Sequence, residues 1–401
     1  MNVLQINAVC GGSTGRNAVE MAQVLRRQGH HCVLVYAAGS PSPDVECRRI
    51  GSNWDHKLHA LCSRLTGKQA YFSRRATERL LRYMKEFCPD IVHLHNLHAN
   101  YIHLPRLLTY LSQHNIATVI TLHDCWPFTG KCTHYQQTGC RKWQTGCHHC
   151  PALKQDNVSW LFDRTSHMFQ DKKEGFSGIP RLGVVGVSDW ITDEARHSFL
   201  AGAQKVCRIY NWVNLQVFSP GAASARTMYG IDDKTYVVLC IAAGWKNDEK
   251  WRDLCDISKH LQEDERLVLV GRLASGLTLP NGVLHIPYVE ETTKLAAIYA
   301  MADVYVHLSR QDTFGKVIAE ALSCGTPVVV YNNTACPELV PPGGGFHVPT
   351  GDTAAILTCL HLLRERGPYA LSRTCRTFAQ ERFSMSANIN AYVDLYKELC
   401  K

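Results

Sequence analysis

The sequence predicts an α/β protein of two domains, each built on a doubly wound parallel sheet with helices on both faces. Its 401 residues, 45% of them hydrophobic, are enough for about two hydrophobic cores. Short apolar runs of strand length alternate with segments of helical periodicity, as in β-α-β units. This series occurs twice, on either side of an irregular segment at residues 211–234.

The first series predicts a domain over residues 1–210. An apolar run at 3–7 is followed by a turn of small residues and by a helix over 17–28, which Gly29 ends. Because helical patterns separate several of the later apolar runs, we expect the strands to lie parallel in one sheet. These later runs lie at 32–36, 91–94, 117–122 and 183–187.

The second series predicts a domain over residues 211–385. Pro220, Gly221 and the small residues near them indicate a linker or an irregular loop at its start. The last segment, 386–401, has apolar residues at helical spacing and is expected to form a helix that crosses back to the first domain. The strands of this domain are expected at 236–241, 267–270, 283–286, 304–308 and 327–331.

The net charge and the composition of the chain indicate which partners and which cellular compartment to expect. Lys and Arg number 43 against 35 Asp and Glu, a net charge of +8 that suits anionic ligands such as nucleotides or an acidic membrane surface. We expect no nucleic-acid partner. The N-terminus lacks the leader of a signal peptide, and no apolar run is long enough to span a membrane. These features predict a cytoplasmic protein whose membrane contact is peripheral, at the inner face of the cytoplasmic membrane.

Acidic residues flank the start of a helix in the second domain. Asp312 is expected in the loop after a parallel strand, where open α/β sheets bind ligands, and Glu320 two turns into the next helix. Loop amides at a positive helix end can bind a diphosphate. Alternatively, Asp312 helps to cap the helix and Glu320 is solvated. The amides expected to face the anion belong to Thr313, Phe314 and Gly315.

A second turn of this domain carries lysines. Lys246 and Lys250 follow the strand expected at 236–241, and their charges can neutralise phosphate. Two lysines in a polar turn can equally be solvated. Their position ahead of the acidic segment favours the phosphate role.

In the first domain, a glycine-rich turn joins the first strand to the first helix. Its glycines let backbone amides approach a ligand, and its arginine can bind phosphate or an acceptor. The alternative is a tight packing turn, and the match to a nicotinamide-binding fingerprint is poor. The turn consists of Gly12, Ser13, Thr14, Gly15 and Arg16, after Cys10 and Gly11.

Histidines occupy the ends of two strands of the first domain. His93 and His95 lie on the same side of one strand, and His123 and Asp124 end another. We expect His93 to be a satisfied packing residue. His95, His123 and Asp124 are candidates for the ligand-binding edge of the sheet.

A cysteine-rich loop is expected at residues 125–151. Four thiolates, including a Cys-x-x-Cys pair, can close a tetrahedral zinc site. Such a site has no open position, so the zinc is expected to hold the loop rather than to catalyse. Free thiols are the alternative. The four expected ligands are Cys132, Cys140, Cys147 and Cys150, with Cys125, His134, His148 and His149 as competing ligands.

These landmarks together resemble glycosyltransferase family four, in particular its colanic-acid and exopolysaccharide branch. The resemblance depends on four motifs. The first is an acidic pair with seven residues between them, followed by Ala-Leu-Ser-Cys-Gly-Thr-Pro-Val-Val, and the second is the basic turn upstream of it. The other two are Gly-Ser-Thr-Gly-Arg and Trp-Gln-Thr-Gly-Cys-His-His-Cys-Pro. The resemblance covers nearly the whole chain. It implies a GT-B architecture, in which two Rossmann-like domains face a cleft.

The resemblance also implies roles for single residues. Asp312, where the family usually has glutamate, would bind the transferred sugar, and Glu320 the ribose. Lys250 matches the family lysine that neutralises the diphosphate; Trp245 aligns with the family arginine, so Lys246 would supply the second charge. His123 matches the histidine that hydrogen-bonds the donor sugar. The residues implied on the acceptor side are Gly12, Ser13, Thr14, Gly15, Arg16, His95 and Asp124, and Trp212 departs from a family glycine.

The implied function is retaining transfer of a sugar from a UDP- or GDP-sugar to a glycan acceptor, lipid-linked, in polysaccharide synthesis. No catalytic metal is expected, because fixed cations and amides can stabilise the leaving diphosphate. The alternatives are an epimerase or phosphorylase of the same fold and a catalytically silent binding module.

Overall fold

The structure, a computed structural model, describes residues 1–221 and 224–401, which form two compact units. The first unit comprises Met1–Tyr210 and Asn388–Lys401, and the second comprises Asn211–Ala387. The segment predicted as a linker, 211–234, is therefore part of the second unit, and its residues 222–223 lie outside the described residues.

The first unit is built on a parallel sheet with strand order β3-β2-β1-β4-β5-β6-β7. Its central strands, β4 and β5, are buried along their whole length, as continuous apolar runs require in a sheet covered on both faces. The strands are β1 (Asn2–Ile6), β2 (His31–Tyr36), β3 (Glu46–Arg49), β4 (Ile91–Leu94), β5 (Ala117–Leu122), β6 (Leu182–Gly186) and β7 (Lys205–Arg208).

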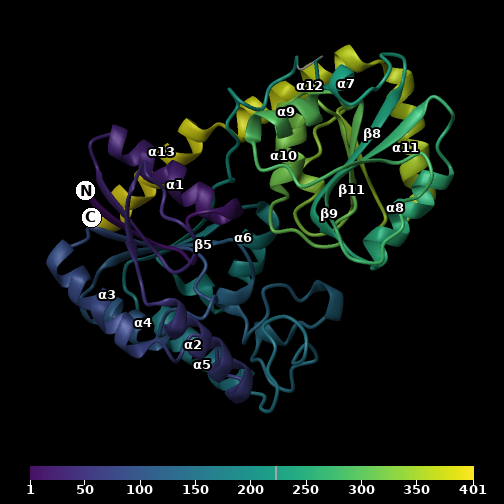
Figure 1. The fold of residues 1–401 in the computed structure, drawn as a ribbon. Coiled ribbons are helices and arrows are strands. Elements are labelled where there is room, and N and C mark those ends of the chain that lie inside the picture. The colour runs from purple at the N-terminus through teal and green to yellow at the C-terminus, as the bar shows by residue number, and fades with distance from the viewer. Residues whose placement is uncertain (222–223) are drawn as a thin grey trace. The chain divides into compact units, whose positions relative to one another are not determined.

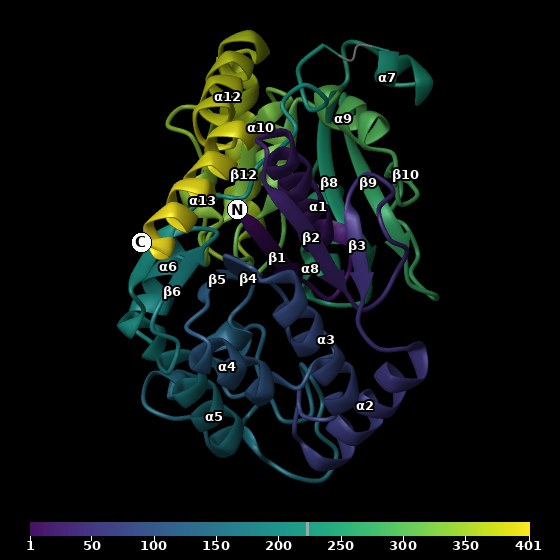
Figure 2. The ribbon, with the colours of Figure 1, turned by 90° about the vertical axis from the view of Figure 1, so that its left-hand side faces the viewer.

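Helices cover both faces of this sheet. The α-helices are α1 (Gly12–Arg27), α2 (Asn53–Thr66), α3 (Arg74–Phe87), α4 (Leu104–Gln113), α5 (Thr165–Ser177), α6 (Asp189–Arg196) and α13 (Met385–Cys400). Figures 1 and 2 show α1 and α13 on one side of the sheet and α3 and α4 on the other. Short 3-10 helices lie at η1 (Trp126–Phe128), η2 (Gln136–Thr138), η3 (Lys142–Gln144) and η4 (Phe199–Gly202).

The first helix begins earlier than the predicted residue 17. It starts at Gly12, so the segment predicted as a turn forms the first turn of α1. Gly15 is the reason that this start is possible, because a Cβ at that position would lie 2.5 Å from the carbonyl carbon of Cys10. A glycine there lets the helix begin directly against the end of β1.

The C-terminal helix returns to the first sheet. The hydroxyl of Tyr392 lies 2.9 Å from Thr121 Oγ1, and that of Tyr396 lies 2.6 Å from His93 Nδ1. All four side chains are buried, which fixes α13 on the sheet. His93 is thus the satisfied packing residue that the sequence predicts.

The second unit repeats the topology of the first. Its parallel strands have the order β10-β9-β8-β11-β12-β13, and Figure 1 shows α8 and α11 on one side of them and α9, α10 and α12 on the other. The strands are β8 (Tyr236–Trp245), β9 (Glu265–Leu273), β10 (Leu284–Ile286), β11 (Val304–His307), β12 (Val328–Tyr331) and β13 (Gly345–Val348). The helices are α7 (Ser224–Met228), α8 (Glu249–Lys259), α9 (Thr292–Ala300), α10 (Lys316–Ser323), η5 (Pro337–Leu339), α11 (Thr353–Arg366) and α12 (Pro368–Arg382).

Three strands that the sequence does not predict, β3, β7 and β13, lie at edges of the sheets. Edge strands are short and partly solvated, so they lack the continuous apolar run by which the inner strands are recognised. Within residues 1–221 and 224–401, no helix has both the length and the hydropathy that crossing a lipid bilayer requires.

Candidate active site

Each sheet has one point where its strand order reverses, between β1 and β4 in the first unit and between β8 and β11 in the second. In open α/β sheets, ligands bind at the carboxyl ends of the strands at such a point. Most of the predicted site residues follow these four strands, while His123 and Asp124 follow β5, the neighbour of β4.

In the second unit, the loop after β11 leads into α10. Gly315 caps this helix in the left-handed conformation, with φ +80°, which a glycine adopts without strain. The Asp312 amide donates to Thr334 Oγ1 at 2.9 Å, and the Ala335 amide donates to the Asp312 carbonyl at 3.2 Å. These bonds fix the loop, while the buried ring of Phe314 packs edge-on against Phe383. Thr313, Phe314 and Gly315 thus immediately precede the positive end of α10.

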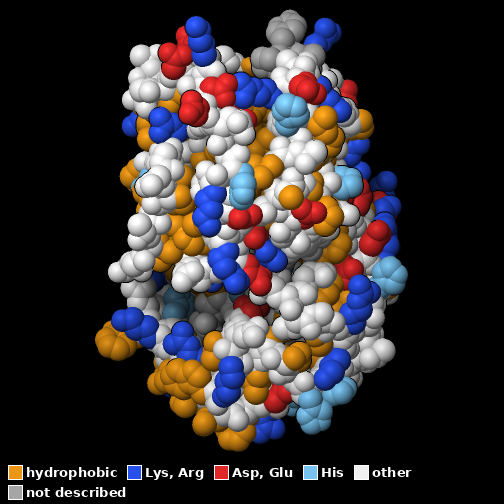
Figure 3. All heavy atoms as spheres, turned by 90° about the vertical axis from the view of Figure 1, so that its right-hand side faces the viewer, with side chains coloured by type: hydrophobic (Ala, Val, Ile, Leu, Met, Phe, Trp, Pro, Cys, Tyr) orange, Lys and Arg blue, Asp and Glu red, His pale blue; other side chains and the backbone are white. Residues whose placement is uncertain are grey.

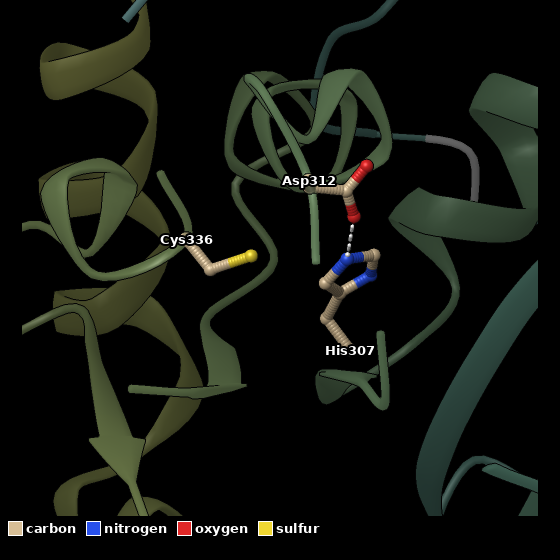
Figure 4. A group of neighbouring side chains, drawn as sticks. All are labelled: His307, Asp312 and Cys336. Atoms are coloured by element: carbon tan, nitrogen blue, oxygen red, sulfur yellow. Dashed lines mark hydrogen bonds and ion pairs between the residues drawn. The ribbon is translucent and has the colours of Figure 1, made fainter. Parts of the chain in front are cut away.

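The carboxylate of Asp312 is held by His307, the last residue of β11. His307 Nε2 lies 2.6 Å from Asp312 Oδ2, and the Tyr305 hydroxyl lies 2.9 Å from the other ring nitrogen, Nδ1. Figure 4 shows the imidazole directed at the carboxylate and the Cys336 thiol pointing toward this pair from across the loop. One ligand atom from each of His307, Asp312 and Cys336 lies within 4.8 Å of the others. His307 was not identified from the sequence, although its place at a strand end, like that of His123, is a usable signal.

Glu320 is buried inside α10. Only 4% of its surface is exposed, and the Tyr299 hydroxyl lies 3.2 Å from its carboxylate. The alternative of a solvated Glu320 is therefore wrong. A buried carboxylate that keeps a hydrogen-bond donor is suited to accept further hydrogen bonds from a ligand hydroxyl.

Lys250 lies in the first turn of α8, with its ammonium nitrogen 4.5 Å from the centre of the Trp245 ring. Burial lowers the pKa of Lys250 below its usual range, while Asp248, Cys240 and Asp312 oppose that shift. The charge of Asp312 thus reaches Lys250 within the same unit. Lys246 differs, because its side chain is 77% exposed and lies 4.0 Å from Asp248.

Trp245 is a buried residue that donates its indole N–H to the Val270 carbonyl at 2.9 Å. It supplies an aromatic face to Lys250 instead of a second charge.

Arg310 is a further charged residue of this edge that the sequence did not single out. Its guanidinium lies 2.8 Å from Asp253 and 3.2 Å from Glu249, both on α8. Its partners are distant in sequence, so no local motif identifies them. The arginine ties the loop that carries Asp312 to the helix that carries Lys250.

In the first unit, the predicted glycine-rich segment forms the exposed start of α1. Gly12 has φ +67° and no neighbour where a Cβ would stand, and Ser13 is exposed. Thr14 and Arg16 are half-buried, and Arg16 Nε donates to the Gly12 carbonyl at 3.2 Å. The N-cap residue of this helix, Gly11, makes no side-chain cap, and helix-start amides of this kind can bind an anion.

His123 is positioned by a chain of buried side chains. His123 Nε2 lies 3.1 Å from His95 Nδ1, and His95 Nε2 lies 3.0 Å from Gln5 Oε1. Gln5 donates its amide to Ala18, so its oxygen accepts from His95. His95 therefore carries its proton on Nε2 and accepts at Nδ1 from His123.

The contacts of His95 do not support direct contact with an acceptor. His95 is 3% exposed, and both of its ring nitrogens have protein partners. Burial, with the neighbouring His93 and His123, holds the pKa of His95 well below 6.5, so the ring is neutral. His95 acts through His123, as a positioning residue.

The contacts of Asp124 likewise lie within the protein. Its carboxylate is buried, lies 2.9 Å from His98 Nε2, and accepts the Trp126 amide at 2.9 Å. Burial alone would raise the pKa of Asp124, but His98 and the Trp126 amide outweigh it and lower the pKa. Asp124 is an internal ion-pair partner that shapes the turn after His123.

The predicted metal ligands Cys132, Cys140, Cys147 and Cys150 lie between η1 and α5. All four line one small cavity of about 20 Å³ in the first unit. Of the competing ligands, His148 also lines this cavity.

Comparisons with known proteins agree with this geometry. A family model described as "Glycosyl transferases group 1" matches residues 228–374, and one described as "Glycosyltransferase Family 4" matches residues 14–217. The chain is 24% identical over 432 residues to the Escherichia coli K12 protein named "Putative colanic acid biosynthesis glycosyl transferase WcaC", with 100% of both chains covered. It is 26% identical over 389 residues to a "GDP-mannose-dependent alpha-mannosyltransferase" of Mycobacterium tuberculosis CDC 1551 / Oshkosh, covering 92% of this chain and 87% of that one.

The fold is that of solved glycosyltransferases with two parallel-sheet domains, the GT-B architecture. The crystal structure of Anabaena Alr3699/HepE in complex with UDP-glucose matches with a TM-score of 0.66 at 14% identity, covering 99% of this chain and 100% of that one. The Family 4 model alone spans just over half of the chain, 14–217, and the Group 1 model spans Lys250, Asp312 and Glu320. The chain therefore belongs to glycosyltransferase family 4 and is a glycosyltransferase of the hexosyltransferase class.

Proposed function

We propose that this glycosyltransferase moves a sugar, with retention of configuration, from a nucleoside diphosphate donor to a glycan acceptor in polysaccharide synthesis. The observation that carries the proposal is the grouping of opposite charges at one sheet edge of the second unit. Lys250 and the start of α10 suit a diphosphate, while the carboxylates of Asp312 and Glu320 suit sugar and ribose hydroxyls.

The chemistry requires few protein groups. The bond between the anomeric carbon and the diphosphate oxygen breaks, and the acceptor oxygen forms a bond to the same face of that carbon. The acceptor proton passes to the departing diphosphate, which leaves as the nucleoside diphosphate. Lys250 and the α10 amides stabilise its charge, so we propose no catalytic metal.

His123 is proposed to hydrogen-bond the transferred sugar. Its Nε2–H is engaged by His95, so the tautomer is fixed before any ligand arrives. A fixed ring loses little entropy when the sugar binds.

The proposed donor class is a UDP- or GDP-sugar. The Anabaena neighbour binds UDP-glucose by its name, and the mycobacterial relative is named for GDP-mannose. Titration calorimetry with UDP-glucose and GDP-mannose, followed by transfer assays on lipid-linked and free glycans, tests this class. Binding of a donor together with transfer of its sugar is the expected result.

Charge-neutral variants sharpen this test. Lys250→Gln and Glu320→Gln are each expected to weaken donor binding about tenfold or more, because each removes a charge-assisted contact. Lys259→Gln and Glu263→Gln, exposed positions of the same unit, serve as matched controls. Unchanged donor affinity in both test variants would remove the proposed site.

Three other outcomes would each replace the proposal. Turnover of the donor without an acceptor would indicate an epimerase, and dependence on free phosphate a phosphorylase. Donor binding with no transfer to any acceptor would indicate a silent binding module.

A lipid-linked acceptor and contact with the inner face of the cytoplasmic membrane are also proposed, on the surface of α2. The exposed side chains of Trp54, Leu58, Leu61 and Leu65 follow one another at spacings of four, three and four residues, on one helix face. Trp54 is 80% exposed, and the Lys57 ammonium lies 5.3 Å from its ring centre.

A neighbouring loop extends this surface. The Trp160 amide donates to the Arg64 carbonyl of α2 at 2.6 Å, and exposed Leu161 and Phe162 follow. The Arg64 and Arg164 guanidinium groups lie over the rings of Trp160 and Phe162. Figure 3 shows hydrophobic side chains beside Lys and Arg at the bottom of the view, the level of α2 in Figure 1. Aromatic and basic side chains together suit an anionic lipid surface.

Vesicle sedimentation tests the membrane contact. The protein is expected to bind vesicles of phosphatidylglycerol and phosphatidylethanolamine, and Trp54→Ser with Leu58→Ser to weaken binding about tenfold. Met228→Ser, an equally exposed apolar residue of the second unit, is the control. Equal binding to purely zwitterionic vesicles, or no loss in the double variant, would contradict the proposal.

A further inference from the structure

The cysteine-rich segment after η1 is a long stretch with little regular structure. Between Phe128 and Thr165, every residue of which is described, the structure has only the short helices η2 and η3. A connection of this length in a compact domain is ordinarily functional or disordered. Here it is well packed, because Trp143 is buried between the rings of Phe128 and Tyr135.

Four cysteines that are far apart within this segment meet at its centre. Cys132, Cys140, Cys147 and Cys150 all line the same cavity of about 20 Å³. The thiols of Cys132 and Cys150 are hydrogen-bonded to each other. A cavity of this volume can hold one particle of about the size of a water molecule.

Backbone amides already point at two of these sulfur atoms. The Gly130 amide donates to Cys147 Sγ at 3.2 Å, and the Ala152 amide donates to Cys150 Sγ. Such N–H···S bonds fix the orientation of a sulfur and favour its thiolate form, as the groups around metal ligands do.

Two buried lysines lie beside the cluster, and among the described residues neither is in direct contact with a carboxylate. Lys131 and Lys172 are each 2% exposed. Lys131 Nζ donates to the Ala152 carbonyl at 2.6 Å, and Lys172 Nζ to the carbonyls of Trp126 and Thr129 at 2.7 and 2.9 Å. In the part of the chain that the structure describes, neither nitrogen has a carboxylate within 4.0 Å.

Burying a cation without an anion costs free energy, so negative charge near the two lysines would stabilise the folded segment. Lys131 lines the cavity, and Lys172 interacts electrostatically with Cys147, with the carboxylate of Asp124 and with Cys132. Zinc held by thiolates of all four cysteines would carry a net charge of −2, which the two ammonium groups neutralise.

We propose that Cys132, Cys140, Cys147 and Cys150 bind one zinc ion, which holds the segment after η1 in its folded form. Cys125, His134 and His149 do not line the cavity. His148 does, because it directly follows Cys147 in the Cys-x-x-Cys pair. Among the described residues, no three of these sulfur atoms lie within 4.8 Å of one another, so binding closes the side chains onto the ion. With every position filled by sulfur, the zinc is structural.

The proposed zinc site would also affect the position of His123. The Cys125 amide, two residues after His123, donates to the Thr133 carbonyl at 2.8 Å, next to Cys132. Holding the segment therefore also holds the turn that follows His123.

Metal analysis of the whole chain tests the proposal. The protein is purified under reducing conditions without immobilised metal and measured by inductively coupled plasma mass spectrometry. About one zinc per chain is expected, released by a mercurial that titrates the thiols. Replacement of the zinc by Co²⁺ is expected to give the absorption bands of a tetrahedral thiolate site.

Single variants identify the ligands. Cys147→Ser is expected to lose most of its zinc, Cys147→His to keep it, and Cys88→Ser, an exposed cysteine elsewhere in the unit, to match the parent. If Cys147→Ser is insoluble, the zinc content of the parent and of Cys147→His still tests whether the four cysteines bind zinc. Zinc below about a tenth of an equivalent with all thiols reduced would overturn the proposal. So would a Cys132–Cys150 disulfide in the purified protein, or full zinc in Cys147→Ser.

Discussion

The two units have the same strand order but different chemistry where that order reverses. In the first unit, the side chains at this edge form a chain of hydrogen bonds, Gln5–His95–His123, next to the uncapped start of α1. In the second unit, the corresponding edge carries charges, with Lys250 within reach of Asp312 and Arg310 bridging to α8.

The contrast indicates a division of labour. Fixed charges bind a diphosphate strongly, whereas an imidazole that is oriented by hydrogen bonds can contact a sugar away from those charges. The common sheet topology provides the position for both sites. The residues at the strand ends decide which chemistry each site performs.

The largest expected effect on the rate comes from removing the side chain of His123. His123→Ala is expected to lower kcat about 1000-fold while the donor Kd changes by less than about threefold, because donor binding depends on the second unit. Rate measurements at saturating donor and calorimetry separate the two effects. His114→Ala, an exposed histidine of the same unit, is the control. A parallel loss of donor affinity would show that the two units do not divide the work in this way.

A smaller effect is expected from His307, which orients Asp312. His307→Ala removes the donor of the 2.6 Å bond and is expected to lower kcat about 100-fold with little change in donor Kd, because the carboxylate can then rotate. His307→Gln keeps an N–H donor and is expected to recover most of the rate. If both variants lose donor affinity and kcat equally, His307 supports the fold of the loop instead.

The sequence predicted the inner parts of both sheets. The strands expected at 91–94 and 117–122 coincide with β4 and β5, because strands buried on both faces are apolar throughout. The edges and the start of α1 could not be predicted in the same way. An edge strand such as β3 is half-solvated, and α1 begins early through the close contact of Gly15 with Cys10, which local patterns do not reveal.

Residues of the candidate site could be predicted only where they belong to a short sequence motif. The acidic segment and Lys250 belong to short motifs, but Arg310 acts through Asp253, 57 residues away. His95 and Asp124 were given a ligand-contacting role because a strand end is open to ligands in general. Their burial depends on packing against Gln5 and His98, which the sequence does not show.

Acid is expected to weaken the first unit specifically. Burial lowers the pKa of His59 and of His93 to about 3, and holds the pKa of His95 well below 6.5. The unfolded chain therefore binds protons that the folded chain does not. The stability from these neutral histidines is present above pH 6.5 and is lost as the pH falls toward about 3.

Each such histidine is expected to cost about 2 kcal/mol between about pH 7 and pH 5. Hydrogen exchange read by mass spectrometry, corrected for the intrinsic rates, should show the first unit losing protection before the second. His59→Gln should reduce this acid dependence, while the exposed His114→Gln should not. Equal loss of protection in both units would contradict the assignment.

The smallest expected effect concerns the trio His307, Asp312 and Cys336, whose ligand atoms lie close enough to hold a metal. Unlike the four-cysteine cluster, the trio already uses its histidine and carboxylate in a direct hydrogen bond, and Asp312 is the proposed sugar contact. Cys336→Ala is therefore expected to change kcat by less than about twofold, and brief treatment of the zinc-loaded enzyme with EDTA to leave the rate unchanged. A loss above about tenfold that added Zn²⁺ or Mn²⁺ restores only when Cys336 is present would make the trio a catalytic metal site. In that case the charged edge of the second unit, not the cysteine-rich segment of the first, would hold the metal on which transfer depends.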